Sequence, residues 1–257
     1  MTGKSSHTVL VTGAGRRIGR AIALGLGRDG HAIAVHYRAS ADEAKSVAGE
    51  IVEAGGRAVA LKADLTCEDE VKRLIGAAAD ALGPVDCLIN NASVFENDAV
   101  GTATRESWDA HMETNLRAPF VLTQTLAAAL PAKAHGNVIN ILDERVRNLT
   151  PHFISYTLSK AGLWTLTRTL ALALAPRIRV NAVGPGPILP SPRQTQAQFD
   201  RQASMMPLGQ GSTPEEICDA VRFILAAPAM TGQMIALDGG QHLGWAQPGW
   251  DGDPKEE

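Results

Sequence analysis

The sequence is poor in the features that mark disulfide-rich, nucleic-acid-binding and membrane-spanning proteins. Its three cysteines, Cys67, Cys87 and Cys218, are odd in number and far apart, which favours reduced thiols over a disulfide framework. It has no long run of lysine or arginine and its net charge is -3, so neither nucleic acid nor an anionic membrane is an expected partner. No hydrophobic stretch is long enough for a signal sequence or a spanning helix. We therefore expect a soluble, cytoplasmic protein, and we predict no metal site.

The sequence does contain enough hydrophobic residues to form a core of ordinary size. Of its 257 residues, 45% are hydrophobic and 20% are charged. Length alone allows one large domain or two small ones. No internal repeat or linker divides the chain, so we expect residues 1–257 to form one domain, with flexible ends at 1–7 and about 246–257.

Short apolar runs rich in β-forming residues alternate with stretches of helical periodicity. The runs are TVLVT (8–12), HAIAVHY (31–37), RAVALKA (57–63), DCLIN (86–90), NVINIL (137–142), RIRVNAV (177–183) and QMIALD (233–238). Nearly continuous apolar strands indicate burial on both faces, as in a parallel sheet. Between them, stretches such as 16–30, 40–56 and 68–83 have apolar residues at helical spacing and end near glycine. The pattern predicts an α/β fold: a single doubly wound Rossmann-type domain with a seven-stranded parallel sheet flanked by helices.

A glycine-rich turn, VTGAGRRIGRAIA, follows the first predicted strand and opens a helix. In such folds, ligands bind beyond the carboxyl ends of the strands. Gly13, Gly15 and Gly19 would let the backbone pass close to a pyrophosphate, and the helix N-terminus would offer it unpaired N–H groups. The alternative is a tight turn with a purely structural role, but the position after the first strand favours a dinucleotide site.

The end of the second predicted strand favours NADP(H) over NAD(H). An NAD site usually carries a carboxylate there for the ribose hydroxyls, whereas this chain has HYRAS, from His36 to Ser40. Arg38, together with Arg17, offers charge-assisted hydrogen bonds to a 2′-phosphate. The alternative for Arg38 is a solvated loop charge.

Seven motifs follow one another over nearly the whole chain: TGAGRRIG (12–19), ADL (63–65), NNAS (90–93), TNL (114–116), YTLSK (156–160), RVNAVGPGP (179–187) and TGQMIALDGG (231–240). Each motif alone is weak, but the ordered set resembles the short-chain dehydrogenase/reductase family. The resemblance implies the doubly wound fold that the alternating pattern predicts independently.

Two departures narrow the resemblance. The family's glycine turn usually reads TGxxxGxG, but here Arg17 replaces the middle glycine. The usual catalytic serine, thirteen residues before the tyrosine, is replaced by Asp143. Both substitutions are similar to the pteridine reductase branch, which includes bacterial dihydromonapterin and dihydrofolate reductases, and so is the segment VHYRASADEA. Phe95 matches the aromatic residue that stacks on the pterin ring in that branch, which implies a pterin-like substrate.

By this resemblance, Tyr156 is the proton donor and Lys160 is its partner, which also holds the nicotinamide ribose. A free tyrosine has a pKa of about 10, so proton exchange near neutrality requires a lowering by roughly 3 pH units, or about 4 kcal/mol. The helical i, i+4 spacing places Lys160 beside the ring, where an ammonium would favour the phenolate. The alternative is a solvent-facing pair on an amphipathic helix.

Asp143 suits the reduction of a C=N bond, whose nitrogen must gain a proton. A carboxylic acid can deliver that proton, whereas a serine can only donate a hydrogen bond. The hypothesis requires a desolvated cleft that raises the pKa of Asp143 above its reference of about 4. Asp143 would then share proton delivery with Tyr156. Alternatively, Asp143 only pairs with Arg145 or Arg147, and the enzyme acts on another substrate.

The other site residues are also implied by the resemblance. Asn115 matches a family asparagine that anchors a water in the proton relay, with helix capping as the alternative. Asp64 either touches the adenine or caps the next helix. The stretch 188–208 lies where the family has a substrate lid, in which Phe199 and Met206 either line the pocket or pack the lid down.

The predicted site thus has three groups of residues. The catalytic residues are Tyr156, Lys160, Asp143 and Asn115, and the substrate contacts are Phe95, Arg17, Asp143 and Tyr156. The cofactor contacts are Gly13, Gly15, Arg17, Ile18, Gly19, Tyr37, Arg38, Ser40, Asp64, Leu65, Asn91, Ala92, Ser93, Tyr156, Lys160, Pro185, Gly186 and Ile188.

These residues predict an NADPH-dependent reductase of a pterin or related ring. Two rival functions stay open. One is a reductase of ordinary carbonyls such as keto-sugars or 3-oxoacyl thioesters, which Tyr156 and Lys160 alone would support. The other is a protein that senses NADP(H) without turnover. The resemblance also implies a homotetramer built around helices at 103–130 and 154–175, although a monomer core could use the same apolar runs.

Overall fold

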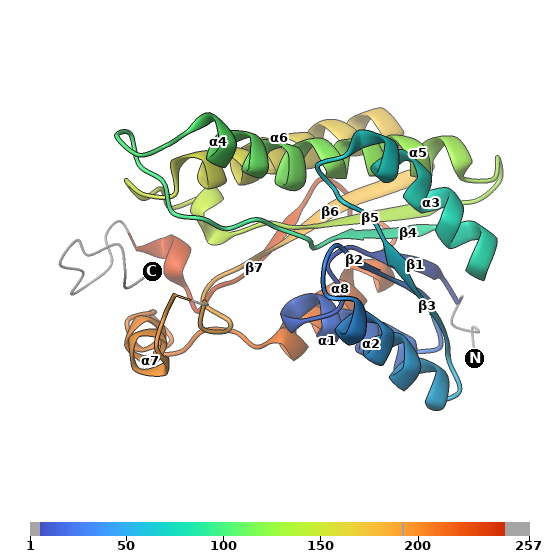
Figure 1. The fold of residues 1–257 in the computed structure, drawn as a ribbon, viewed down its shortest axis with the longest axis horizontal. Coiled ribbons are helices and arrows are strands. Elements are labelled where there is room, and N and C mark those ends of the chain that lie inside the picture. The colour runs from blue at the N-terminus through green and yellow to red at the C-terminus, as the bar shows by residue number, and fades with distance from the viewer. Residues whose placement is uncertain (1–5, 192, 245–257) are drawn as a thin grey trace.

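All seven predicted strands form in the computed structural model, which describes residues 6–191 and 193–244. They are β1 (Thr8–Val11), β2 (Ala32–Tyr37), β3 (Arg57–Lys62), β4 (Cys87–Asn90), β5 (Gly136–Ile141), β6 (Ile178–Pro185) and β7 (Met234–Leu237). Every neighbouring pair is parallel, in the order β3-β2-β1-β4-β5-β6-β7 (Figure 1). The predicted doubly wound, seven-stranded parallel sheet is confirmed.

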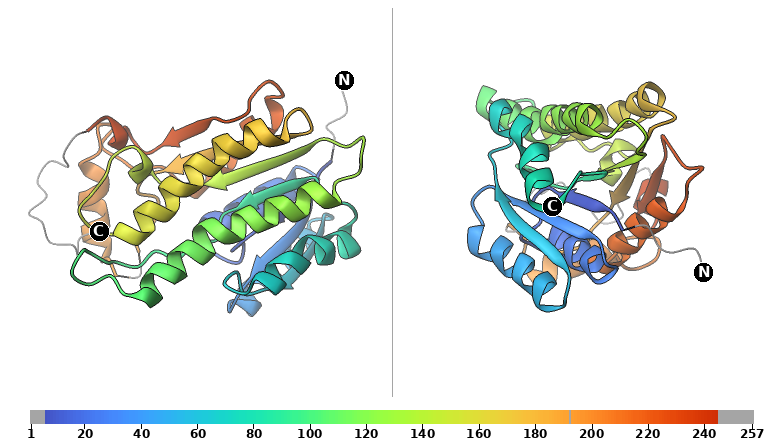
Figure 2. Two further views of the ribbon diagram at one scale, coloured as in Figure 1. Left: turned by 90° about the horizontal axis from the view of Figure 1, so that it is seen from above. Right: turned by 90° about the vertical axis from the view of Figure 1, so that its right-hand side faces the viewer.

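Helices cover both faces of the sheet (Figures 1 and 2). One layer holds α1 (Arg17–Arg28), α2 (Ala41–Glu53) and α8 (Pro214–Ala226). The other holds α3 (Glu68–Leu82), α4 (Arg105–Met112), α5 (Ala118–Ala129) and α6 (Ile154–Leu174). The central strands are covered on both sides, and every residue of β4 and β5 is buried, the polar Asn90, Asn137 and Asn140 included.

The predicted helix at 154–175 is confirmed as α6, but the one at 103–130 is interrupted. Its first part, α4, passes into a π-helical turn at Glu113–Arg117 before α5 begins at Ala118. Such π turns often occur at functional sites, and this one contains Asn115.

The order of the strands reverses at β1, since β2 lies on one side of it and β4 on the other. The chain leaves these strands in opposite directions, which opens a crevice beyond their carboxyl ends. The segments that surround this crevice follow β1, β4, β5 and β6, and the last of them leads into α7 (Gln196–Ser204).

Of the ends predicted to be flexible, residues 1–5 and 246–257 lie outside the part that the structure describes. Ser6 and His7 are tied to the loop before β2: the Ser6 hydroxyl donates to the Gly30 carbonyl at 2.8 Å, and the His7 N–H donates to His31 Nδ1 at 2.9 Å. Within residues 6–191 and 193–244, none of the helices is long and apolar enough to cross a membrane.

Candidate active site

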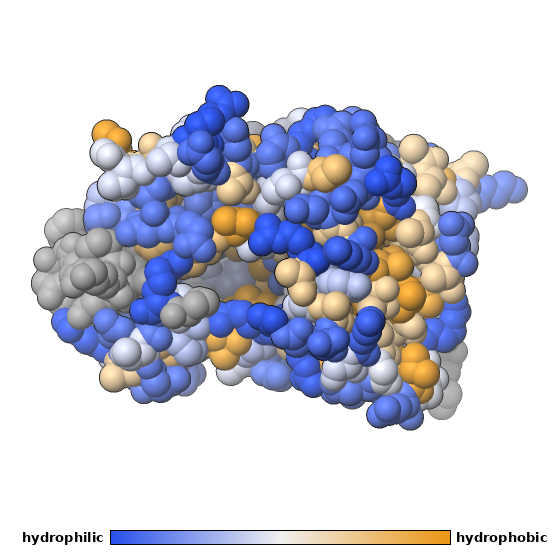
Figure 3. All heavy atoms as spheres, viewed as in Figure 1, coloured by the Kyte–Doolittle hydropathy of each residue, from blue (hydrophilic) through white to orange (hydrophobic). Residues whose placement is uncertain are grey.

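A cleft of about 910 Å³ lies at the carboxyl ends of the central strands. It opens between the two helical layers, and its rim is largely hydrophilic (Figure 3). Nearly all the predicted site residues line it, although they come from segments more than 170 residues apart in the sequence. The exceptions are Gly15 and Asn115.

The glycine turn after β1 is built for close backbone approach. Gly13 has a φ of +62°, and a Cβ on Gly19 would lie 2.3 Å from the Gly13 carbonyl oxygen, so no side chain fits there. Arg17, at the position where the family usually has glycine, also adopts a left-handed φ of +52°. Residues other than glycine adopt this conformation at a cost of about 1–2 kcal/mol, so the turn keeps its shape despite the substitution.

Gly15 is buried but faces away from the cleft. A Cβ there would lie 3.2 Å from Ser40 Oγ and 3.3 Å from the backbone nitrogen of Ala44, at the start of α2. Its small size serves the packing of the turn against α2, and its predicted contact with the cofactor stays a prediction.

His36, at the end of β2, supports the glycine turn from below. Its Nδ1 accepts a hydrogen bond from the Gly13 N–H at 3.0 Å, and its Nε2 lies 3.1 Å from the Ala63 carbonyl oxygen. Burial lowers the pKa of His36 to about 4, so the ring is neutral with its proton on Nε2. No sequence motif assigns this role to His36, and its place at the end of an apolar strand is the one signal for it in the sequence.

The loop after β2 presents cations to one end of the cleft. Arg38 is exposed there, as is Arg16, which pairs with Glu43 of α2. Asp64 also lines this end, but it does not cap α3, whose N-cap is Cys67. Its carboxylate instead accepts hydrogen bonds from the Thr66 N–H and hydroxyl at 2.9 and 2.8 Å, which lower its pKa.

The chain leaving β4 crosses the floor of the cleft. Asn91 Nδ2 donates to the Thr12 carbonyl oxygen at 2.8 Å, and the Thr12 hydroxyl accepts from the N–H groups of Asn91 and Ala92 at 2.9 and 3.0 Å. These bonds fix the β4 exit to the glycine turn. The predicted contacts Asn91, Ala92 and Ser93 all lie along this floor.

Tyr156 and Asp143 form a hydrogen-bonded pair in the cleft, with the tyrosine hydroxyl donating to Asp143 Oδ2 at 2.7 Å. Burial, followed by the charge of Asp143 and this hydrogen bond, raises the pKa of Tyr156 well above its ordinary value. The predicted lowering of this pKa by Lys160 is therefore wrong for the arrangement seen here, because a carboxylate sits directly on the hydroxyl. Tyr156 is held as the protonated phenol.

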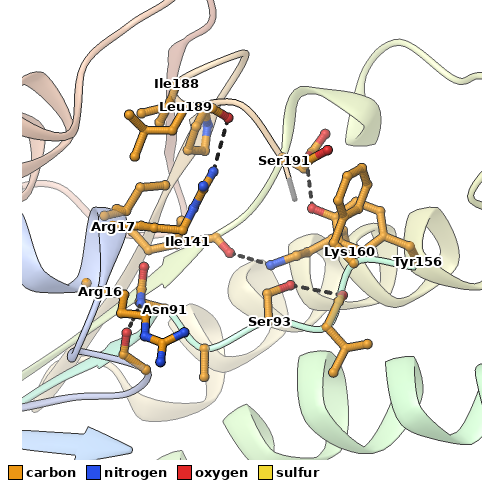
Figure 4. A pocket seen from close by; sticks show the side chains of 18 of the residues that line it. Arg16, Arg17, Asn91, Ser93, Ile141, Tyr156, Lys160, Ile188, Leu189 and Ser191 are labelled. Carbon is orange, nitrogen blue, oxygen red and sulfur yellow. Dashed lines mark hydrogen bonds between the residues drawn. The ribbon is translucent and has the colours of Figure 1, made fainter. Parts of the chain in front are cut away.

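Lys160 is fully buried beneath the site. Its Nζ lies 5.7 Å from the centre of the Tyr156 ring, as the helical spacing predicts, but donates to the Ile141 carbonyl oxygen at 2.9 Å (Figure 4). Burial lowers its pKa to about 8, so the ammonium form still predominates at neutral pH.

Asp143 contacts both Tyr156 and Arg145. While Oδ2 faces Tyr156, Oδ1 accepts from the Arg145 backbone N–H at 2.9 Å and from its guanidinium at 3.3 Å. The Arg145 side chain is only 7% exposed and also lies 3.8 Å from Glu144. The sequence analysis assigned no place in the cleft to Glu144 or Arg145, since their burial depends on the short helical turn at Glu144–Val146.

Asn115 lies behind the cleft rather than in it. Its Nδ2 donates to the Val94 carbonyl oxygen and to Ser159 Oγ at 2.9 and 3.0 Å. Its Oδ1 accepts from the Val94 N–H and the Ser93 hydroxyl at 2.8 and 3.2 Å. These four bonds use the hydrogen-bonding capacity of the side chain, so its predicted anchoring of a water is not supported.

Phe95 forms part of the wall next to Tyr156. Its ring stacks on that of Phe153 with centres 4.5 Å apart, and meets the Tyr156 ring edge-on at 4.7 Å. Phe153 is fully buried and has a left-handed φ of +55° just before α6 begins. One face of Phe95 is thus already covered, which leaves at most the other face for a ligand.

Two arginines connect the predicted lid to the rest of the cleft. Arg17 reaches from the start of α1 to the carbonyl oxygens of Leu189 and Pro190, at 3.1 and 2.8 Å (Figure 4). Its guanidinium therefore points to the lid and not to the Arg38 end, where the sequence analysis expected it. Arg193, in the lid itself, pairs with Glu96 at 2.8 Å. Nothing in the sequence motifs signalled this second contact.

Within the lid, Phe199 lines the cleft, whereas Met206 is buried away from it, 4% exposed. Both alternatives for the lid's apolar residues are therefore realised, each by a different residue.

The cleft fits a dinucleotide. It combines a side-chain-free turn for a pyrophosphate with cations at one end and a proton donor at the other. Three buried side-chain oxygens of its lining, Thr114 Oγ1, Ser191 Oγ and Gln241 Oε1, have no hydrogen-bond partner among the residues that the structure describes. In the part of the chain that the structure describes, no cluster of three or more His, Cys, Asp or Glu is placed to hold a metal ion.

Comparison with known proteins adds relatives that share both the sequence and the fold. The pattern of the short chain dehydrogenase family matches residues 7–201. FolM alternative dihydrofolate reductase 1 from Brucella suis, solved in complex with NADP, is 48% identical with a TM-score of 0.91, over 94% of this chain and 97% of that one. The Brucella canis protein of the same name, also complexed with NADP, is 46% identical with a TM-score of 0.89, over 94% and 96%. The 3-oxoacyl-[acyl-carrier-protein] reductase of Synechocystis sp. is 33% identical over 244 residues, covering 93% of this chain and 98% of that protein. The two FolM structures agree with the branch that the sequence motifs indicate.

Proposed function

The chain belongs to the short-chain dehydrogenase/reductase family, and from this premise we propose that it is an NADPH-dependent reductase of a pterin or a related ring. The observation that carries the proposal is the hydrogen bond between Tyr156 and Asp143, at the position where the family usually has serine. Similarity to two FolM alternative dihydrofolate reductases supports the substrate class.

NADP(H) is the proposed cofactor, and when bound it would supply the hydride. Gly13 and Gly19 would receive the pyrophosphate, since no side chain blocks the turn. Arg38 and Ser40 line the end of the cleft where a 2′-phosphate would lie, and Arg16 adds a third donor there. Neither β2 nor this turn offers the carboxylate that an NAD site would place on the ribose. NADP complexes of both FolM structures support this choice.

Tyr156 and Asp143 would deliver the proton that the nitrogen of a C=N bond must gain. The phenol is kept protonated by its surroundings, so the proton to be donated is present on Tyr156 at neutral pH. Once the phenol has given up its proton, a proton taken up by Asp143 could reach the phenolate across the 2.7 Å hydrogen bond. The buried ammonium of Lys160, 5.7 Å from the ring centre, would limit the build-up of negative charge on the pair.

The second candidate function is reduction of an ordinary carbonyl, and the similarity to 3-oxoacyl-[acyl-carrier-protein] reductases over 93% of the chain favours it. Tyr156 with Lys160 would suffice for that chemistry, since a carbonyl oxygen needs only one proton. The substrate contacts would then not require Asp143.

Replacing Asp143 by serine distinguishes the two. For a pterin reductase we expect kcat/KM on dihydrobiopterin to fall at least about 100-fold, because one of two acids is lost. Activity on simple ketones should change by less than about fivefold or rise. Asp143→Asn, which keeps the shape but cannot supply the proton, serves as a second variant, and Asp109→Ser on the exposed face of α4 serves as the control. An equal loss on both substrate classes would contradict the proposal, since Asp143 would then only support Tyr156.

We extend the proposal to a homotetramer assembled through α5 and α6. Leu158 and Leu172 are 46% and 84% exposed and lie fourteen residues apart on α6, which places them on nearly the same face of the helix. Sedimentation analysis of the purified protein tests this, and a monomer at micromolar concentration would contradict it.

A further inference from the structure

A buried set of polar side chains lies behind the substrate end of the cleft and takes no part in the proton donor pair. Asp98 comes from the loop after β4, His111 from α4 and Ser155 from the first turn of α6. Their exposed fractions are 2%, 0% and 0%. None belongs to a sequence motif, and Asp98 and Ser155 are 57 residues apart.

The direction of each hydrogen bond in this set is fixed by its neighbours. The Glu96 backbone N–H donates to His111 Nε2 at 3.1 Å, so the ring proton is on Nδ1, which donates to Ser155 Oγ at 2.7 Å. The Ser155 hydroxyl then donates to Asp98 Oδ2. Burial lowers the pKa of His111, which keeps the ring neutral. Burial alone would raise the pKa of Asp98, but hydrogen bonds from Ser155 and Ser107 outweigh it and the pKa is lowered.

This arrangement is not a hydrolytic triad. In such a triad the histidine lies between the serine and the carboxylate, whereas here the serine lies between the other two. The Ser155 hydroxyl is also fully buried. The set therefore has a structural use rather than a nucleophilic one.

Asp98 ties its loop to the start of α6. The Ile154 N–H donates to the Asp98 carbonyl oxygen at 3.3 Å, and the Ser155 N–H donates to Asp98 Oδ1 at 3.1 Å. The N-cap residue Phe153 makes no side-chain cap hydrogen bond. Asp98 thus satisfies N–H groups of the first turn that a cap would otherwise serve, in the helix that carries Tyr156.

Two side chains, Asn115 and the network residue His111, hold the loop on the two sides of Phe95. Val94, the residue before it, exchanges two backbone hydrogen bonds with the Asn115 side chain, at 2.8 and 2.9 Å. Glu96, the residue after it, donates its N–H to His111. The Phe95 ring, held between these two points, meets Tyr156 at 4.7 Å.

We propose that His111, Ser155 and Asp98 are positioning residues that fix the Phe95 ring relative to Tyr156, and so hold in place one wall of the space that receives the flat ring of the substrate. This inference rests on the proposed function for the nature of that ring. The loop is the part that the network controls, because α6 is held independently through Lys160 and its buried residues against the sheet. Loosening the network should therefore displace Phe95 more than Tyr156.

The test compares Ser155→Ala with Thr157→Val in the same helical turn. Thr157 is also buried, and its hydroxyl has no hydrogen-bond partner within residues 6–191 and 193–244, so it controls for a disturbed helix start. For Ser155→Ala we expect KM for dihydrobiopterin to rise about tenfold, kcat to change less than about threefold, and the Kd of NADPH to stay within about twofold. For Thr157→Val, all three should stay within about twofold.

Amide hydrogen exchange measured by mass spectrometry gives a second readout that needs no substrate. In Ser155→Ala, peptides covering residues 94–99 should exchange at least about tenfold faster than in the wild type, while Thr157→Val leaves them unchanged. If Ser155→Ala does not fold, Asp98→Asn replaces it, since the amide keeps an acceptor for the Ser155 N–H but turns a donor toward its hydroxyl.

The inference is overturned if both KM and exchange of the loop stay at wild-type values in Ser155→Ala, or if Thr157→Val has the same effects. It is also overturned if kcat falls while KM and loop exchange do not change. Failure of the wild type to reduce any pterin would contradict the proposed function instead, and loop exchange would then decide this inference alone.

Discussion

The buried neutral imidazole of His36 makes the stability of the fold depend on pH in a defined window. Its pKa is about 4 in the folded protein against 6.5 as the ordinary value, because protonation would place a charge in the core. Protonation would also remove the acceptor for the Gly13 N–H. Between these two values the unfolded chain takes up a proton at this position and the folded chain does not. The titration of His36 therefore does not affect the free energy of unfolding above about pH 6.5, and lowers it increasingly as the pH falls towards 4.

The expected size follows from the difference of about 2.5 pH units, which corresponds to about 3 kcal/mol when fully developed, and to about 2 kcal/mol at pH 5. Solvent does not screen this change in the free energy of unfolding, since His36 is only 1% exposed. The measurement is the free energy of unfolding in urea at about pH 7.5, 6, 5 and 4.5.

His36→Asn isolates this contribution from the other titrating groups. Its carbonyl oxygen can still accept from the Gly13 N–H, but the residue does not titrate. We expect the variant to be less stable at pH 7.5, by about 1–2 kcal/mol for the lost bond to Ala63 and the lost ring volume. On going from pH 7.5 to pH 5, the free energy of unfolding of the variant should fall by about 2 kcal/mol less than that of the wild type. Equal losses in the two proteins, within about 0.5 kcal/mol, would refute the assignment of this pH dependence to His36.

Two further substitutions test the glycine turn and the proton donor. Gly19→Ala should abolish measurable NADPH binding or prevent folding, because its Cβ would lie 2.3 Å from the Gly13 carbonyl oxygen. Thermal unfolding with and without NADPH checks this, and an NADPH-induced rise in Tm equal to that of the wild type would contradict it. Tyr156→Phe should lower kcat at least about 100-fold by removing the acid, while stability changes by only about 1 kcal/mol and the Kd of NADPH stays within about twofold. Retention of more than a tenth of kcat would show that Asp143 alone delivers the proton.

The seven strands of the parallel sheet could be predicted from the sequence because burial on both faces leaves a direct pattern. Strands such as β4 are buried at every position, and three of its four residues are correspondingly apolar. The π-helical turn at Glu113–Arg117 could not be predicted, because its local sequence is compatible with a regular helix. It places Asn115 so that both its amide groups meet the backbone of Val94.

The pair of Asp143 and Tyr156 was predictable because both residues belong to motifs at a fixed spacing. The pKa of Tyr156 was not predictable, since the sequence suggested that the ammonium of Lys160 would lower it. The structure shows the hydroxyl bonded to a carboxylate and the ammonium bonded to a backbone carbonyl. The direction in which the Arg17 side chain points could not be predicted either, because its partners, Leu189 and Pro190, lie in a loop more than 170 residues further along the chain.

The network of Asp98, His111 and Ser155 left no signal in the sequence. Each residue taken alone suits an exposed loop or helix position, and only the packing of α4 against α6 brings them together. Buried polar groups that come from distant segments can be recognised only once the tertiary structure is known.

The central claim is that the cleft reduces a pterin with NADPH. The direct measurement mixes the purified protein with NADPH or NADH and follows the absorbance of the reduced cofactor on addition of dihydrobiopterin, dihydromonapterin, dihydrofolate or a panel of simple ketones. We expect rapid consumption of NADPH with at least one of the pterins, at least about tenfold slower consumption with NADH, and little with the ketones. Turnover of ketones alone would contradict the claim and leave a carbonyl reductase with the same fold and the same Tyr156 and Lys160.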